Sequence, residues 1–168
     1  EKANLVLALN ETYQELVAHK AEDVSSANGI HGLKIESGVW TPILGWGGKE
    51  DLNHVYAKQQ GAYYLVGKKL FISFEIELTT KDSFEGGSVM ITGLPFAIYD
   101  PNFKPVGSLY FENVELPPST FNLHLRQPYA NTQLFILATG SNKPAQNFRS
   151  IYIKDNSKIY GSIELIIR

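Results

Sequence analysis

The chain has 168 residues, of which 43% are hydrophobic, and this length allows one main hydrophobic core with a short appended segment. Its formal net charge of −2 provides no strong field to hold nucleic acid or an anionic membrane surface, so we expect neither partner. Cysteine is absent, which excludes disulfides, thiol nucleophiles and thiolate metal sites.

Residues 1–22 predict a helix with a heptad stripe. The segment contains no glycine or proline, and Leu5, Leu9, Thr12 and Leu16 follow one another at spacings of four, three and four. An isolated helix of about 20 residues is only marginally stable in water, so the stripe must be covered, either by its own domain or by copies of itself. Its place before the polar, turn-forming segment 23–37 favours a coiled-coil stalk followed by a neck.

From residue 38 onward the pattern is that of strands. In residues 68–80, Leu70, Ile72, Phe74, Ile76 and Leu78 alternate with polar or exposed positions, which is the period of a half-buried strand. Turns rich in Gly, Pro, Asn and Asp separate the segments. Further strands are predicted over 39–44, 55–60, 62–66, 88–94, 97–100, 107–116, 120–126, 132–139 and 162–168. No second helical pattern is present, so residues 38–168 predict a mainly β head, an antiparallel, jelly-roll-like β-sandwich.

The sequence contains no standard catalytic or cofactor-binding signature. The phosphate-binding loop, the serine-hydrolase elbow, the zinc-protease helix and the EF-hand calcium loop are all missing. We therefore predict no catalytic residue, no cofactor and no enzyme activity. No apolar run approaches the roughly 18 residues of a membrane span, so we expect no membrane insertion.

Two glutamates leave an alternative open. Glu75 and Glu77 lie two residues apart on the same face of a predicted strand. The arrangement is typical of a solvated strand face, and it is also compatible with the acid and base pair of a glycan-degrading enzyme. Asp100 with Glu112 is a second pair of this kind.

The histidines predict no metal site. His19 ends the heptad stripe, where an imidazolium suits a helix C-terminus, and His31 lies between glycines in the neck. His54 and His124 are far from both in sequence and are interpreted as a loop residue and a strand residue. A single histidine at each place is a poor ligand set.

Aromatic residues in predicted turns are the more informative feature. Such rings either fold back to cap the ends of the body or fill a subunit interface, or they meet the apolar face of a sugar ring. The residues concerned are Trp46, Phe84, Phe103, Tyr129 and Phe148.

Residues 37–96 resemble the C-terminal body of bacteriophage tail-fibre and tail-tip receptor-binding proteins. The resemblance is carried by a G-x-W-T-P opening, a G-x-Y-x-x-x-G strand pair, a long alternating strand and an I-x-G-L-P-F turn; the matching residues are Gly38, Trp40, Thr41, Pro42, Gly61, Tyr63, Gly67, Ile91, Gly93, Leu94, Pro95 and Phe96. Residues 19–32 and 160–168 resemble the neck and the final strand of such fibres.

This resemblance implies a homotrimer with a coiled-coil stalk (residues 1–22), a neck (23–37) and a receptor-binding head (38–168), located in the tail fibre or tail tip of the virion. The function implied is multivalent, non-covalent attachment to a bacterial surface glycan of the cell wall polysaccharide or teichoic acid type. Since residue 1 is Glu, we expect a missing upstream part that joins other tail or baseplate proteins. An axial metal is not expected, because the H-x-H pair of metal-binding fibres is absent.

The resemblance does not locate the glycan site. Our candidates are loop aromatics and hydrogen-bonding groups, namely Trp46, Asp100, Phe103, Tyr129, Asn131 and Arg149; Arg149 is equally suited to an ion pair between subunits. Two other functions remain open, a glycan-degrading tail component and a purely structural fibre-tip domain.

Overall fold

The computed structural model describes residues 2–21, 35–98, 105–127, 132–141 and 143–167. The chain divides into two compact units, one of residues 1–36 with 65–67 and one of residues 37–64 with 68–168. Among the described helices, none is both long and apolar enough to cross a membrane.

The first unit contains helix α1 (Lys2–Ala21), which confirms the predicted helix. Its apolar side chains stay in contact with solvent: Leu9 is 71% exposed and Leu16 is 49% exposed. Tyr13, between them, is exposed as well. Leu9 and Leu16, two residues of the stripe predicted from the heptad spacing, are therefore uncovered.

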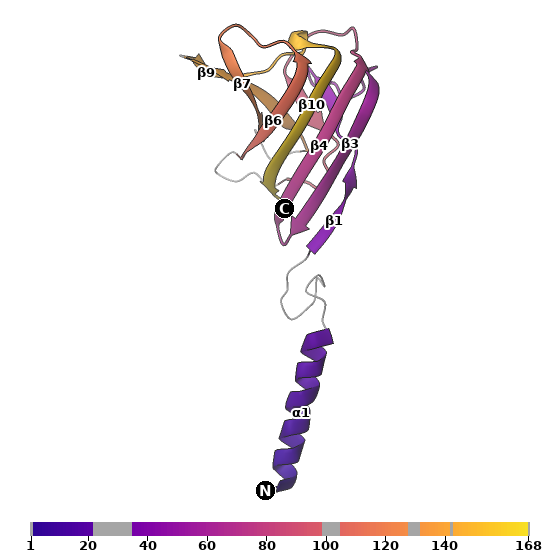
Figure 1. The fold of residues 1–168 in the computed structure, drawn as a ribbon, viewed down its shortest axis with the longest axis vertical. Helices are drawn as coiled ribbons and strands as arrows, with labels where there is room; N and C mark the ends of the chain where they lie inside the picture. Colours follow the sequence, from indigo (N-terminus) through magenta and orange to yellow (C-terminus); the bar gives the residue numbers. More distant parts are fainter. Residues whose placement is uncertain (1, 22–34, 99–104, 128–131, 142, 168) are drawn as a thin grey trace. The chain divides into compact units, whose positions relative to one another are not determined.

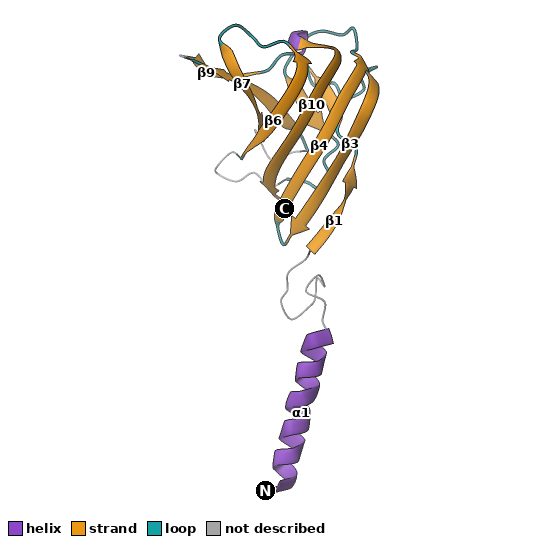
Figure 2. Ribbon diagram, in the orientation of Figure 1, coloured by secondary structure: helices purple, strands orange, loops and turns teal. Residues whose placement is uncertain are grey.

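The second unit is built from strands, and the structure confirms a mainly β, antiparallel body (Figure 2). The elements found in the described part of the chain are β1 (Ile35–Trp40), β2 (Ile43–Trp46), β3 (Val55–Val66), β4 (Lys69–Thr80), β5 (Val89–Thr92), β6 (Val106–Val114), β7 (Thr120–Arg126), β8 (Leu134–Gly140), β9 (Lys143–Asn147), the short 3₁₀ helix η1 (Ser150–Tyr152) and β10 (Ile153–Ile166).

These strands form one continuous curled sheet, where two separate sheets of a sandwich were expected. The hydrogen-bonded order is β1-β3-β4-β10-β6-β7-β8-β5-β2, and β9 pairs with β8. Figure 1 shows β1, β3, β4, β10 and β6 side by side. The curl brings Phe74 of β4 and Leu125 of β7 against Gly161 of β10, on the inner face of the sheet.

The predicted inner face of β4 is confirmed. Leu70, Ile72, Phe74, Ile76 and Leu78 are all buried, and each such side chain contributes about 1.5–3 kcal/mol of apolar burial. The intervening side chains are exposed or half-buried. The alternation of apolar and polar residues thus predicted both the strand and which of its faces is buried.

Three predicted boundaries are wrong. Residues 39–44 form not one strand but parts of β1 and β2, which end up at opposite ends of the sheet path. Residues 55–60 and 62–66 belong to the single strand β3. Strand β9 lies between the predicted strands 132–139 and 162–168, where no strand was predicted. In addition β1 already begins at Ile35, within the expected neck.

The largest omission is the first half of β10. Residues 153–161 were not predicted as a strand, because the polar run Asp155-Asn156-Ser157 interrupts the alternation. The structure accommodates this run in an irregularity of the β10–β6 pairing, where Asn156 has a φ of 60°. The strand then continues to Ile166 in the middle of the sheet.

Candidate functional site

The outer face of β4, β10 and β6 places aromatic, acidic and basic side chains in two rows across the sheet. In the first row, Tyr160 of β10 stands opposite Glu75 of β4 and Tyr110 of β6. In the second row, Lys158 stands opposite Glu77 and Glu112. We refer to these residues, together with Lys58 and Gln60 of β3, as the outer-face cluster.

Hydrogen bonds and ion pairs connect the rows. The Tyr160 hydroxyl donates to Glu77 Oε1 at 2.9 Å, and the Tyr110 hydroxyl donates to Glu112 Oε1 at 3.2 Å. Lys158 Nζ lies 3.3 Å from Glu112 Oε2. The two tyrosine rings lie side by side, with centroids 5.8 Å apart and planes inclined by 45°. The rows therefore hold both rings in fixed positions.

Glu75 is held from the β3 side. Lys58 Nζ lies 2.6 Å from Glu75 Oε2, and Gln60 Nε2 donates to the same oxygen at 3.0 Å. The Glu75 side chain is 21% exposed. Because donors on β3 orient this carboxylate, it presents its oxygen atoms in a defined direction to a ligand at the surface.

The carboxylates give the cluster a negative local field. Burial, followed by the hydrogen bond to Glu77 and the charges of Glu77, Glu75 and Glu112, raises the pKa of Tyr160 to about 12. The hydrogen bond and charge of Glu112 raise the pKa of Tyr110 and also that of Lys158. At neutral pH both tyrosines are neutral hydroxyl donors and Lys158 is charged.

A cavity of about 690 Å³ adjoins the first row. Tyr160, Glu75 and Gln60 line it, and the lining also includes Trp40, Thr41 and Ser73. A Cβ on Gly61 of β3, which also lines the cavity, would overlap the Trp40 indole. Tyrosine faces beside carboxylate and amide groups provide both the apolar surface and the hydrogen-bonding partners that a sugar ring needs.

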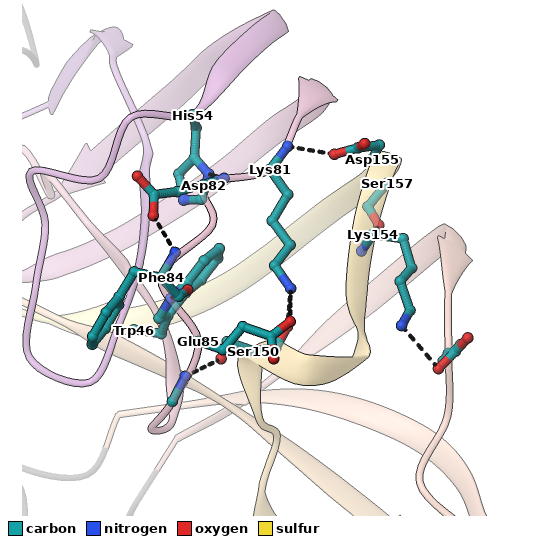
Figure 3. A network of polar contacts seen from close by, with 12 residues as sticks. Trp46, His54, Lys81, Asp82, Phe84, Glu85, Ser150, Lys154, Asp155 and Ser157 are labelled. Atoms are coloured by element: carbon teal, nitrogen blue, oxygen red, sulfur yellow. Dashed lines mark hydrogen bonds and ion pairs between the residues drawn. The ribbon is translucent and has the colours of Figure 1, made fainter.

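Trp46 does not belong to this site, which corrects the prediction of an exposed loop aromatic. It lies at the end of β2 and is fully buried. Its Nε1 donates to the Phe84 carbonyl at 2.8 Å, and its ring packs edge-on against His54 with centroids 4.5 Å apart (Figure 3). The ring fills the core, so it is not available to a sugar at the surface.

Of the remaining sequence candidates, only Arg149 can be placed. Asp100, Phe103, Tyr129 and Asn131 lie outside the described residues. Arg149 is exposed and precedes η1, where it lines a different cavity. Of the candidates that can be placed, none lies in the outer-face cluster.

Sequence reasoning missed Tyr110, Tyr160, Lys58, Gln60 and Lys158 as parts of a site. Glu75 and Glu77 were considered only as neighbours on one strand. Their partner Tyr160 lies on β10, at a position that was not assigned to a strand, so its register with Glu75 was unknown. The alternation of Lys158, Tyr160 and Ser162 is the signal that would have placed them on one face.

Two of the four histidines, His54 and His124, can be placed with their side chains in the structure. His54 directly precedes β3, is half-buried and packs against the buried Trp46 ring, while His124 lies in β7 with Nε2 3.0 Å from Thr139 Oγ1. Nothing is described for the His19 side chain, and His31 lies outside the described residues. In the ranges that the structure covers, no three His, Asp or Glu side chains are grouped as metal ligands.

The sequence matches no protein-family model, and no curated protein matches it at a significant level. A solved structure does match the fold: the Dettilon tailspike protein gp208, with a TM-score of 0.66 over 80% of this chain. The chain shares its fold with part of a tailspike. The two sequences are 14% identical, and the chain spans about a quarter (24%) of the length of that protein.

Proposed function

We propose that this chain is the receptor-binding head of a phage tail fibre or tail tip, and that it attaches the virion to a bacterial surface glycan. The observation that carries the proposal is the fold, which this chain shares over 80% of its length with part of a tailspike. The fibre-like motifs in residues 37–96 support it independently, because they were found from sequence alone.

The fibre-like glycines have structural roles that fit the proposal. A Cβ on Gly61 would overlap the Trp40 indole, and a Cβ on Gly38 would overlap the Tyr63 ring. Gly93 has a φ of 79°, a conformation that favours glycine. These residues hold β1, β3 and the turn after β5 in place, so they specify the scaffold and leave the outer face free to vary with the ligand.

The outer-face cluster is the glycan platform in this proposal. Tyr110 and Tyr160 offer two adjacent rings to the apolar face of a sugar, and the Tyr110 ring is 61% exposed. Glu75 and Gln60 at the adjoining cavity can accept from and donate to sugar hydroxyls. The platform lies on strands, which position it more rigidly than loops do.

We further propose that the chain works as a homotrimer. The exposed Leu9 and Leu16 of α1 require a cover, and a copy of the same stripe provides one with matching spacing. Three heads on one stalk multiply a weak single-site affinity against a repetitive polymer. In this proposal the trimer is attached to other tail or baseplate proteins.

We propose binding without turnover, and one observation keeps glycan degradation as the second candidate. Glu75, Glu77 and Glu112 lie on one face of the sheet, and a glycosidase needs two carboxylates that flank the scissile bond. Each already accepts a hydrogen bond or an ion pair from a neighbouring side chain, which supports a role in positioning a ligand.

The test uses the fluorescently labelled chain, a panel of bacterial strains and the wall polysaccharide isolated from any strain that it labels. We expect saturable labelling of some strains, competition by the isolated polymer, and no change in polymer size after prolonged incubation. Shortening of the polymer would establish the degrading function instead. A folded, oligomeric chain that labels no strain would leave only a structural fibre-tip role.

A further inference from the structure

A second cavity, of about 230 Å³, lies where the loop before β7 meets β9 and η1. Arg149 is the only charged residue among the described residues that line it. The polar remainder of the lining includes Gln146, Asn147 and Tyr152. In a chain with a net charge of −2, this is a small pocket of positive charge.

The Arg149 guanidinium is available to a ligand. The residue is exposed, and within the described part of the chain no hydrogen bond or ion pair of its side chain is found. Glu115 is joined to this region by its N–H, which donates to the Tyr152 carbonyl at 2.9 Å. The Glu115 carboxylate, however, pairs with Lys154 Nζ at 3.3 Å.

The backbone around Arg149 is anchored on both sides. Phe148 is fully buried; its N–H donates to the Ile136 carbonyl and its carbonyl accepts from Val89, both at 2.8 Å. Ser150 is also fully buried, and its Oγ accepts from the Gly86 N–H at 2.9 Å (Figure 3). Because the backbone at Arg149 is already ordered, binding a ligand costs only the conformational entropy of the arginine side chain.

The other walls of the cavity are stiff as well. Pro117 and Pro118 open a turn that is closed by the Thr120 N–H donating to the Pro117 carbonyl at 3.0 Å. Asn147 Nδ2 donates to Ser88 Oγ at 2.9 Å, which orients the amide. The Tyr152 ring stacks on Phe148, with centroids 5.6 Å apart.

We propose that this pocket is an anion subsite, in which Arg149 binds a phosphate or carboxylate group carried by the receptor glycan. The planar guanidinium matches either oxyanion with two parallel hydrogen bonds. Gln146, Asn147 and Tyr152 then bond neighbouring hydroxyls. The inference rests on the proposed glycan-binding function and narrows the ligand to an acidic polymer.

The test titrates the full chain with small probes by protein-observed NMR. Glycerol 3-phosphate and galacturonate carry the two oxyanions, while glycerol and galactose are their neutral counterparts. We expect shifts at residues around Arg149 with the acidic probes only. The stronger of the two acidic probes then identifies phosphate or carboxylate as the natural group.

The decisive variant is Arg149→Gln, with Arg126→Gln as the matched control for loss of one positive charge elsewhere in the body. We expect Arg149→Gln to lower the affinity for the acidic probe by about 10- to 100-fold, because a charge-assisted hydrogen bond is lost. The affinity of Arg149→Lys for the acidic probe should fall between those of Arg149→Gln and the wild type. Lysine keeps the positive charge but lacks the planar guanidinium that donates two parallel hydrogen bonds. Thermal melting checks that all three variants fold.

The inference would be overturned by equal binding of neutral and acidic probes, by equal weakening of binding in Arg126→Gln, or by unchanged affinity in Arg149→Gln. A change in the solution mass of Arg149→Gln without a change in affinity would assign the arginine to an ion pair between subunits. Labelling of bacteria by Arg149→Gln as strong as by the wild type would sink the subsite alone. Failure of the wild type to label any strain would sink the broader function.

Discussion

The Trp40 indole occupies the space in which any side chain at Gly61 would begin. This pair joins neighbouring strands, β1 and β3, and it places Trp40 Nε1 3.2 Å from the Ser73 carbonyl on β4, to which it donates. The ring also meets Phe74 edge-on, with centroids 6.0 Å apart. One missing Cβ therefore allows a single aromatic residue to connect three strands beside the larger cavity.

Replacing Gly61 with alanine should destabilise the body. The methyl group overlaps a buried, rigid ring, so the indole must move and its bond to Ser73 is strained or lost. We expect a loss of about 1–3 kcal/mol in the free energy of unfolding, measured by urea denaturation. In a Trp40→Leu background the same substitution should cost much less, and an equal cost in both backgrounds would contradict the packing argument.

His54 should make the stability depend on pH in the mildly acidic range. Burial lowers its pKa below the ordinary 6.5, and its Nδ1 accepts from the Asp82 N–H at 3.0 Å, a bond that exists only while Nδ1 is unprotonated. The unfolded chain thus takes up the proton first, so stability is full above pH 6.5 and falls as the pH decreases toward the lowered pKa. Melting temperatures between pH 7.5 and 5 measure this.

The variant for this prediction is His54→Gln, which keeps an acceptor for Asp82 but does not titrate. Its melting temperature should vary less with pH than that of the wild type over the same interval. Asp82 and Glu85 also have lowered pKa values, but carboxylates act at lower pH. Identical slopes for the variant and the wild type would show that another group is responsible.

Removing the two outer-face rings should weaken attachment to cells. The double variant Tyr110→Ala/Tyr160→Ala deletes both stacking surfaces, and we expect at least a tenfold loss of affinity in flow-cytometric labelling of a susceptible strain. Phe121→Ala is the control, since Phe121 is 72% exposed but lies on β7 and is not part of the cluster. Equal losses in the two variants would argue against the outer face as the site.

The oligomeric state should depend on α1. Light scattering is expected to give a mass near three times 18.7 kDa for the intact chain. Deletion of residues 1–20 tests whether the helix holds the copies together, and Leu9→Asn/Leu16→Asn tests the stripe itself without shortening the chain. A clean monomer of the intact chain would remove the basis for multivalent binding.

Much of the scaffold could be predicted from local sequence patterns, because heptad spacing indicates a helix and alternation indicates a strand such as β4 within about a dozen residues. The boundaries that failed depend on distant partners. Thr41 and Pro42 interrupt an apparently single strand, and only the full topology sends β1 and β2 to different ends of the sheet. The start of β10 was hidden by Asn156 and its polar neighbours.

The candidate site was less predictable than the fold. Trp46 looked like an exposed aromatic because glycines surround it, but the space beside His54 draws it into the core. Tyr160 and Glu77 are separated by 83 positions along the chain, and no local pattern announces their hydrogen bond. Arg149 is exposed, and the cavity beside it could be found only from the fold.

The position of β10 sets the order in which the body can be completed. β10 pairs with both β4 and β6 in the middle of the sheet, although its Tyr160 is synthesised 83 residues after its partner Glu77. Until β10 is synthesised, the edge of β4 that faces away from β3 has no partner strand, and the apolar face of the nascent sheet is exposed to solvent. Folding should therefore begin late, proceed slowly because the contacts are non-local, and expose the growing chain to aggregation on the ribosome.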